Sequence, residues 1–248
     1  MKIIDNLIAR QFAEYTRDSI LQVLIGKHRW FSAMWFRQIW CRLLLKVTSN
    51  KGLFTLIYDK NLWIENESVS GPGSTFEATK NIRAALPELF KKYNIRSVLD
   101  IPCGDFNWMK FVDLRNVKYT GADIVEELIR QNIIKFANDQ ISFCVLDLVR
   151  DTLPDTDLVL CRDGLVHLNN KEVIKALNNI RKSGSKYLFM THFPEQKENQ
   201  QPGQDHWRPI NFRLPPFNFP EPVLVIDENE KQELYKDKSL CMWEIKYL

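Results

Sequence analysis

Strand-like and helix-like segments alternate from residue 97 onward, and this alternation restricts the chain to a few folds. Short apolar runs of strand length are separated by stretches with the periodicity of amphipathic helices. Such alternation predicts an α/β fold with a parallel sheet, right-handed crossovers and helices on both faces. The last two strands have no helix between them, which predicts an antiparallel strand at the sheet edge. The predicted strands are 97–100, 117–122, 141–146, 158–161, 187–190, 223–226 and 242–246, and the predicted helices between them are 106–112, 125–137 and 171–181.

The length of 248 residues suits one substantial core with appendages. We place an N-terminal helical extension and connection at 1–70 and the main domain at 71–248, with a loop insertion at 193–222. A net charge of +3 gives no argument for a nucleic-acid partner. Five scattered cysteines without a C-x-x-C pair argue against a metal site and a disulfide framework, and favour the cytoplasm. The sequence shows neither a secretory signal nor a charge-free window long enough to span a bilayer.

Residues 30–47 include a basic amphipathic helix. Large apolar side chains recur at helical spacing from Trp35 to Val47, while Arg37, Arg42 and Lys46 fall on the other face. A helix of this kind packs on a core, forms a homodimer contact or lies on an anionic membrane surface, and we favour the first two. Peripheral membrane contact through residues 30–47 therefore stays open as an alternative.

Residues 48–73 resemble a connection rich in helix breakers, which ends in Ser70-Gly-Pro-Gly-Ser74. Ser74 and Glu77 have the spacing of a capping box, so a helix is expected directly after this turn. A glycine-rich turn beside a helix N-terminus is either simple punctuation or an anion contact. In the second case Arg83, on the following helix, reaches an anionic group.

The insertion at 193–222 is too long and too rich in proline for an ordinary connection. It carries aromatic and hydrogen-bonding side chains, among them Trp207, Arg208 and Asn211. The loop either covers a sheet edge or recognises a substrate. We favour recognition and expect these three residues, together with Arg83, to contact the acceptor molecule.

Three carboxylates follow three successive strands: Asp100, Asp123 and Asp147. The carboxyl ends of parallel strands share one edge of the sheet, so these side chains are expected to line one crevice. Asp123 lies 23 positions after Asp100, close to the spacing at which an acidic side chain binds ribose hydroxyls. Gly104, in the turn after the first strand, allows a close approach of the backbone to a ligand.

These segments, read in order, resemble the class I S-adenosylmethionine-dependent methyltransferases over residues 75–248. The matching segments are Val98-Leu-Asp-Ile-Pro-Cys-Gly-Asp105, Gly121-Ala-Asp123, Leu146-Asp-Leu148 and Asp157-Leu-Val-Leu-Cys161. The resemblance implies a Rossmann-like, seven-stranded, mostly parallel sheet with an antiparallel terminal hairpin.

The same resemblance implies S-adenosyl-L-methionine as the cofactor and no metal. The loop Asp100–Gly104, with Pro102 and Cys103, would lie along its methionyl part, and Asp123 would bind its ribose. Asp147 would bind the adenine amino group beside Leu148. Ile124 and Arg162 complete the expected cofactor site. The family loop usually reads D-x-G-x-G-x-G, whereas this chain has one glycine and a proline at the first glycine position.

A second, local resemblance covers Cys161-Arg-Asp-Gly-Leu-Val-His167. It is similar to the S-R-D-A-I-L-H segment of phosphoethanolamine methyltransferases, which implies catalytic roles for Asp163 and His167. The spacing would place both side chains on one face of a first helical turn. Imidazole also suits removal of a proton from a neutral acceptor near neutral pH, although a lone histidine is more often a structural residue.

We therefore expect methyl transfer to a small acceptor. The expected atom is an oxygen of a sugar or surface-glycan precursor, or of a phosphorus-containing small molecule, with His167 as general base. The first alternative is a non-catalytic protein that binds S-adenosylmethionine or serves as a scaffold. Asp155-Thr-Asp157 has the D-x-D pattern of a glycosyltransferase, but its position before a strand favours a structural role. No G-x-S-x-G elbow supports a hydrolase, and no G-x-G-x-x-G turn supports a dinucleotide enzyme.

Overall fold

Seven strands form a single mixed sheet in the order β3-β2-β1-β4-β5-β7-β6. The structure is a computed structural model that describes residues 49–203, 206–232 and 235–248, and Ser49–Leu248 is one compact unit. The amphipathic helix expected within 30–47 lies outside the described residues. The strands are β1 (Ser97–Asp100), β2 (Lys118–Asp123), β3 (Ile141–Val145), β4 (Leu158–Cys161), β5 (Tyr187–His192), β6 (Leu224–Asp227) and β7 (Ser239–Glu244).

The first five strands are parallel, which confirms the predicted α/β sheet with its antiparallel terminal hairpin. One detail differs from the prediction. The antiparallel strand β7 is not at the edge, because it pairs with both β5 and β6. Residues 239–243 of β7 are all buried, whereas burial alternates along β6. The more buried strand therefore lies inside the sheet, and β6 forms the edge.

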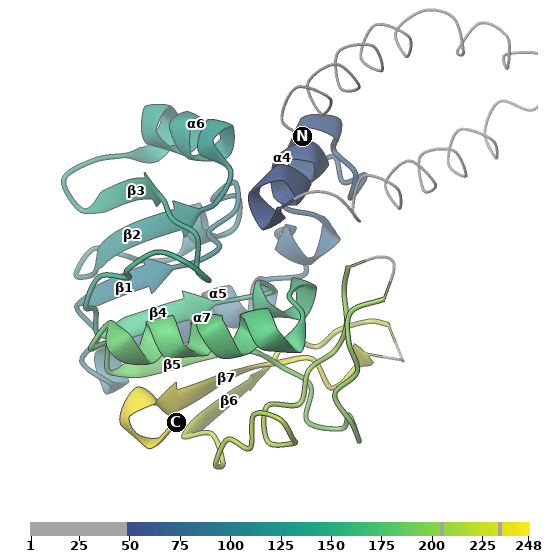
Figure 1. Cartoon of the computed structure of the whole chain (residues 1–248). Coiled ribbons are helices and arrows are strands. Elements are labelled where there is room, and N and C mark those ends of the chain that lie inside the picture. Colours follow the sequence, from purple (N-terminus) through teal and green to yellow (C-terminus); the bar gives the residue numbers. More distant parts are fainter. Residues whose placement is uncertain (1–48, 204–205, 233–234) are drawn as a thin grey trace, which may run out of the picture. The chain divides into compact units, whose positions relative to one another are not determined.

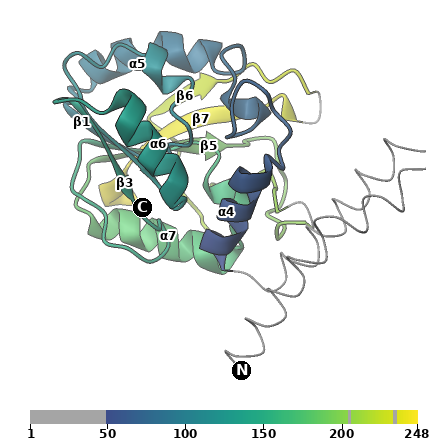
Figure 2. The same cartoon turned by 90° about the horizontal axis from the view of Figure 1, so that it is seen from above.

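Helices cover both faces of the sheet (Figures 1 and 2). On one face, α5 (Lys80–Lys92) and α6 (Glu126–Phe136) share an apolar core with β1 and β2, and on the other face α7 (Asn170–Lys182) packs on β4 and β5. The start of α7 is fixed by a complete capping box between Asn169 and Glu172.

Three expectations about local structure were wrong. Ser74 and Glu77 form no capping box, because Pro72–Ser74 is a 3₁₀ turn and α5 starts only at Lys80. The stretch 106–112 forms only the short 3₁₀ helix Met109–Phe111. The supposed connection at 48–73 contains the helix α4 (Asn50–Lys60), whose first turn is capped by the Ser49 side chain. Figure 1 shows α4 beside one end of the sheet.

Candidate active site

A cavity lies at the carboxyl ends of β1 to β4, where the three carboxylates were expected to meet. Asp100, Asp123 and Asp147 all line it, together with His167. With its open mouth included, the cavity encloses about 1100 Å³. The opposite wall comes from α4 and the segment after it, which contribute Phe54, Ile57, Tyr58, Trp63, Val69 and Ser70.

Asp100 is buried at the end of β1 and accepts a hydrogen bond from the Tyr119 hydroxyl at 2.6 Å. Burial raises the pKa of Asp100 to about 7, although the Tyr119 hydrogen bond and the charge of Arg162 oppose this rise. Protonation of this carboxyl group therefore falls in the neutral pH range, well above the ordinary range of an aspartate. A group in this state can either donate or accept a hydrogen bond from a ligand.

Asp123, at the end of β2, is held by two backbone amides. Gly104 N donates to one of its oxygens at 3.2 Å, and Val125 N donates to the other at 3.0 Å. Burial raises the pKa of Asp123 to about 6 despite these hydrogen bonds. Each carboxylate oxygen keeps a second acceptor site, so a fixed acceptor pair is suited to two neighbouring hydroxyl groups.

Asp147 follows β3 and accepts from Val149 N at 2.8 Å. Apolar side chains of Ile124, Leu146 and Leu148 line the cavity around it. An acceptor oxygen between apolar walls fits a flat heterocycle that carries an amino group. The predicted residues Asp147, Leu148 and Ile124 are thus brought together with Asp123 in one part of the cavity.

The loop after β1 packs closely against two other segments of the chain. A Cβ at residue 164 would lie 2.4 Å from Pro102 Cδ, so Pro102 occupies space that only Gly164 leaves free. Pro102 and Cys103 both line the cavity. Gly104 has φ +56°, and a Cβ there would lie 2.2 Å from Ser70 Oγ. Gly104 is thus required for close packing against Ser70 and a left-handed backbone.

We expect Gly104→Val to weaken both the fold and ligand binding, because it forces Ser70 away and strains the backbone. The free energy of unfolding should fall by about 1–3 kcal/mol. Gly184→Val is a matched control, since Gly184 also has positive φ but its Cβ would meet only Asp155 at an ordinary 3.5 Å. Urea denaturation should show the larger loss for Gly104→Val. Equal losses would mean that the contact with Ser70 is unimportant.

His167 lies in the 3₁₀ turn Leu165–His167 and lines the cavity. The predicted helical turn shared with Asp163 was wrong, because Asp163 has φ +54° and the α-helix begins only at Asn170. The His167 ring stacks on Trp63 with centroids 5.6 Å apart and meets the edge of Phe54 at 5.9 Å. Its Nδ1 lies 2.7 Å from the His206 carbonyl oxygen. Since a carbonyl only accepts, Nδ1 carries the proton and Nε2 carries the lone pair of the neutral ring.

Asp163 and Arg162 belong to a cluster of four charges, of which Arg162, Glu228 and Lys238 are buried and Asp163 is partly exposed. The Arg162 guanidinium contacts Glu228 at 2.6 Å and Asp163 at 3.3 Å, and Lys238 Nζ contacts Asp163 at 2.8 Å and Glu228 at 3.4 Å. Burial would raise the pKa of Asp163, but Lys238 and Arg162 hold it well below its ordinary value. Asp163 is therefore an anion on the same cavity wall as His167.

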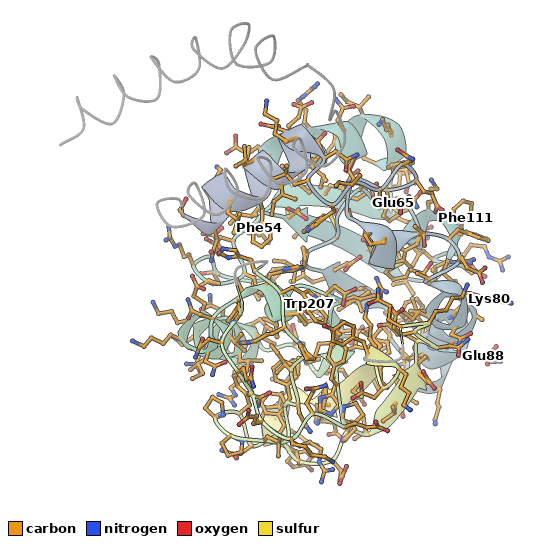
Figure 3. All side chains as sticks on the ribbon, turned by 90° about the vertical axis from the view of Figure 1, so that its right-hand side faces the viewer. Phe54, Glu65, Lys80, Glu88, Phe111 and Trp207 are labelled. Atoms are coloured by element: carbon orange, nitrogen blue, oxygen red, sulfur yellow. The ribbon has the colours of Figure 1, made fainter. Side chains whose placement is uncertain are left out.

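The four residues expected to contact the acceptor do not line the cavity within the described part of the chain. Arg208 donates to the carbonyl oxygens of Gln200 and Leu168, and Asn211 donates to those of Pro194 and Gln196. Trp207 packs against Phe193 and Tyr235, and Figure 3 places it on the long loop below Phe54. The Arg83 guanidinium stacks on Phe76, 3.4 Å from its ring centre. The polar groups of Arg208, Asn211 and Arg83 therefore bond to the chain itself, Trp207 packs against other aromatic rings, and an acceptor contact stays a prediction.

Sequence reasoning missed the contribution of α4 and Trp63 to this site. The available signals were Ser49, which caps the helix, and the helical spacing of Leu53, Phe54 and Ile57. Helix-breaking residues on both sides of this short apolar stretch made the helix hard to recognise from the sequence. Nothing in the local sequence indicates that Trp63 stacks on His167, because the two residues are more than 100 positions apart.

The described residues contain no cluster of three or more histidine, cysteine or acidic side chains that could hold a metal ion. Asp157 of the D-x-D pattern accepts from Arg96 N and Ser97 N at the start of β1, which is the opposite end of the strands from the cavity. Over the same residues, no helix has both the length and the apolar character needed to cross a bilayer.

Comparison with known proteins gives likeness of structure alone. No family model and no curated protein matches the sequence. The chain is similar to magnesium protoporphyrin IX methyltransferase from Synechocystis PCC 6803, solved with bound SAM, with a TM-score of 0.52 and 13% identity over 80% of this chain and 97% of that one. It is also similar to the methyltransferase domain of bacterial CtHen1, with a TM-score of 0.50 and 13% identity over 67% and 99% of the two chains.

Two further matches are partial. One spans 66% of another CtHen1 methyltransferase-domain chain, with 16% identity over 46% of this chain and a TM-score of 0.41. The other spans 58% of the Synechocystis enzyme solved with bound SAH, with 15% identity over 48% of this chain and a TM-score of 0.39. At these identities the likeness establishes the fold. The residues 49–248 thus have the Rossmann-like fold of the class I S-adenosylmethionine-dependent methyltransferases.

Proposed function

We propose that the protein is an S-adenosylmethionine-dependent methyltransferase that acts on a small acceptor. The observation that carries this proposal is the meeting of Asp100, Asp123, Asp147 and His167 in one cavity at the carboxyl ends of the strands. This edge of an open α/β sheet is where nucleotide-like ligands bind. The solved structures with the same fold include methyltransferases with bound SAM or SAH, which supports the same cofactor here.

The residues present fit that cofactor. Asp123, fixed by two amides, offers acceptors for the two ribose hydroxyls, and Asp147 offers an acceptor for the adenine amino group between apolar walls. Asp100, Pro102 and Gly104 line the part of the cavity expected for the methionyl chain. When bound, S-adenosylmethionine supplies an electrophilic methyl group. The task left to the protein is to orient the acceptor and remove its proton.

His167 is the proposed base. Its Nδ1 donates to the His206 carbonyl, which directs the lone pair to Nε2, the atom that would take the proton of the acceptor. Asp163, an anion on the same wall, stabilises the imidazolium that results. A hydroxyl acceptor benefits most from such a base, and this supports an oxygen as the methylated atom.

The aromatic wall made by Phe54 and Trp63 beside His167 supports a ring-shaped acceptor such as a sugar. Arg162 lines the cavity as well, but its charge is shared with Asp163 and Glu228. Between the two acceptor classes considered from the sequence, we therefore favour the sugar or glycan precursor over the phosphorus-containing molecule. A panel of both classes, assayed with S-adenosylmethionine labelled in the methyl group, tests this choice.

Asp123→Asn tests the cofactor assignment. Loss of a charged acceptor should raise the dissociation constant of S-adenosylhomocysteine about 10- to 100-fold in isothermal titration calorimetry. Wild-type affinity should also fall as the pH drops below about 6, where Asp123 takes up a proton, and the variant should lose this dependence. Asp139→Asn, at an exposed position, is the control. Failure of the wild type to bind would disprove the proposal, and binding without turnover on any acceptor would favour a non-catalytic protein.

A further inference from the structure

The segment Glu67–Phe76, which precedes α5, is tied to the loop that follows β1. The Asp105 carboxylate accepts from Ser68 Oγ at 2.9 Å, Ser70 Oγ at 3.2 Å and Val69 N at 3.0 Å. In return, Asp105 N donates to Ser70 Oγ at 2.9 Å. One side chain thus binds three consecutive residues that are 35 to 37 positions away in the sequence.

A second side chain of the same loop fastens the ends of this segment. Asn107 Nδ2 donates to Glu67 Oε1 at 2.8 Å and to the Ser74 carbonyl oxygen at 3.1 Å. Glu67 Oε1 also accepts from Phe76 N. Asn107 therefore holds the 67–76 segment in a closed turn, while Asp105 binds residues 68–70 of this segment to the loop after β1.

The held segment forms part of the cavity wall. Val69, Ser70 and Ser74 line the cavity, and Ser70 fills the space beside Gly104. Gly104 in turn donates its amide to Asp123. Asp105 is not among the described residues that line the cavity, so its effect on a ligand is indirect: it acts through Ser70 and Gly104, and through its charge, which helps to raise the pKa of Asp123.

We propose that Asp105 is a positioning residue for cofactor binding, which holds the 67–76 segment as one wall of the cofactor site and fixes the Gly104 amide against Asp123. This proposal rests on the proposed function. A carboxylate that receives three hydrogen bonds from this segment gives a more rigid wall than a neutral group would, because charge-assisted hydrogen bonds are shorter and stronger. A preformed wall lowers the entropic cost of binding.

Asp105→Asn is the direct test. The Asp105 carboxylate accepts from Ser68 and Ser70 through one oxygen and from Val69 through the other, whereas asparagine has a single accepting oxygen and a nitrogen that only donates, so at least one of these bonds is lost or reversed in direction. We expect the dissociation constant of S-adenosylhomocysteine to rise about 10-fold or more. Hydrogen exchange of the Val69 amide in the ligand-free protein should accelerate. Ser70→Ala, which keeps the charge, should show the same two effects to a smaller extent.

Asp113→Asn is the matched control, because Asp113 binds only its neighbour Arg115 among its described contacts and lies on the surface. It should leave both measurements unchanged, and all variants should keep a cooperative thermal transition. Wild-type affinity in both Asp105→Asn and Ser70→Ala would overturn the proposal. If the wild type does not bind S-adenosylhomocysteine, the proposed function is overturned. The positioning role of Asp105 in cofactor binding is then overturned as well. Val69 exchange would then report separately whether Asp105 holds the segment.

Discussion

Substitution of His167 by asparagine is expected to slow methyl transfer about 10²- to 10⁴-fold while leaving the affinity for S-adenosylhomocysteine unchanged. Asparagine is chosen because its Nδ2 can still donate to the His206 carbonyl as the imidazole Nδ1 does. The variant therefore keeps the anchoring hydrogen bond and loses the basic Nε2. Single-turnover kinetics, with calorimetry for binding, separate these two effects.

The pH dependence of turnover distinguishes a base from a structural histidine. At saturating cofactor, where the loss of affinity caused by protonation of Asp123 does not contribute, turnover of the wild type should decline on the acid side, and the asparagine variant should lose this limb. His206→Asn is the matched control, since it changes a neighbouring histidine but keeps the carbonyl that accepts from His167. Normal turnover in His167→Asn, or an equal loss in both variants, would rule out the base.

The sheet and the carboxylate edge could be predicted because each depends on a local pattern. A strand that is buried on both faces, such as β4, is apolar throughout, and the residue after it must lie at the sheet edge. Asp100, Asp123 and Asp147 therefore follow from the strand positions and the parallel topology alone. The order of β7 and β6 in the sheet could not be predicted from the sequence pattern, because it depends on which of the two strands is more buried.

The side of the cavity opposite the three carboxylates could not be predicted in the same way. Its wall comes from α4 and Trp63, and their roles depend on packing between residues that are distant in the sequence. Sequence alone does not separate two roles of the long loop. Arg208 and Asn211 carry groups typical of ligand recognition, yet a loop without regular structure also uses such groups to satisfy its own carbonyl oxygens.

The charge cluster joins the end of β4 to the terminal hairpin. Arg162 follows β4, while Glu228 and Lys238 come from the hairpin. Burial alone would lower the pKa of Arg162, but Glu228 and Asp163 raise it above its ordinary value. Three buried charges and the partly exposed Asp163 form one contact network, in which each charge is stabilised by its partners. Removal of one member should therefore harm the fold more than removal of a matched pair.

Arg162→Met should lower the free energy of unfolding by about 3–5 kcal/mol, because it leaves Glu228 buried with only the more distant Lys238 at 3.4 Å. The double variant Arg162→Met/Glu228→Met removes both partners and leaves the 2.8 Å pair of Lys238 and Asp163 intact. We expect it to be more stable than the single variant. Urea denaturation of the ligand-free protein measures both changes, and Arg115→Met, which removes an exposed partner of Asp113, should change little. The free energy of unfolding of the double variant could instead fall by the sum of the losses measured for Arg162→Met and Glu228→Met alone. The charges would then be acting independently, and the network could not be what couples the hairpin to the site.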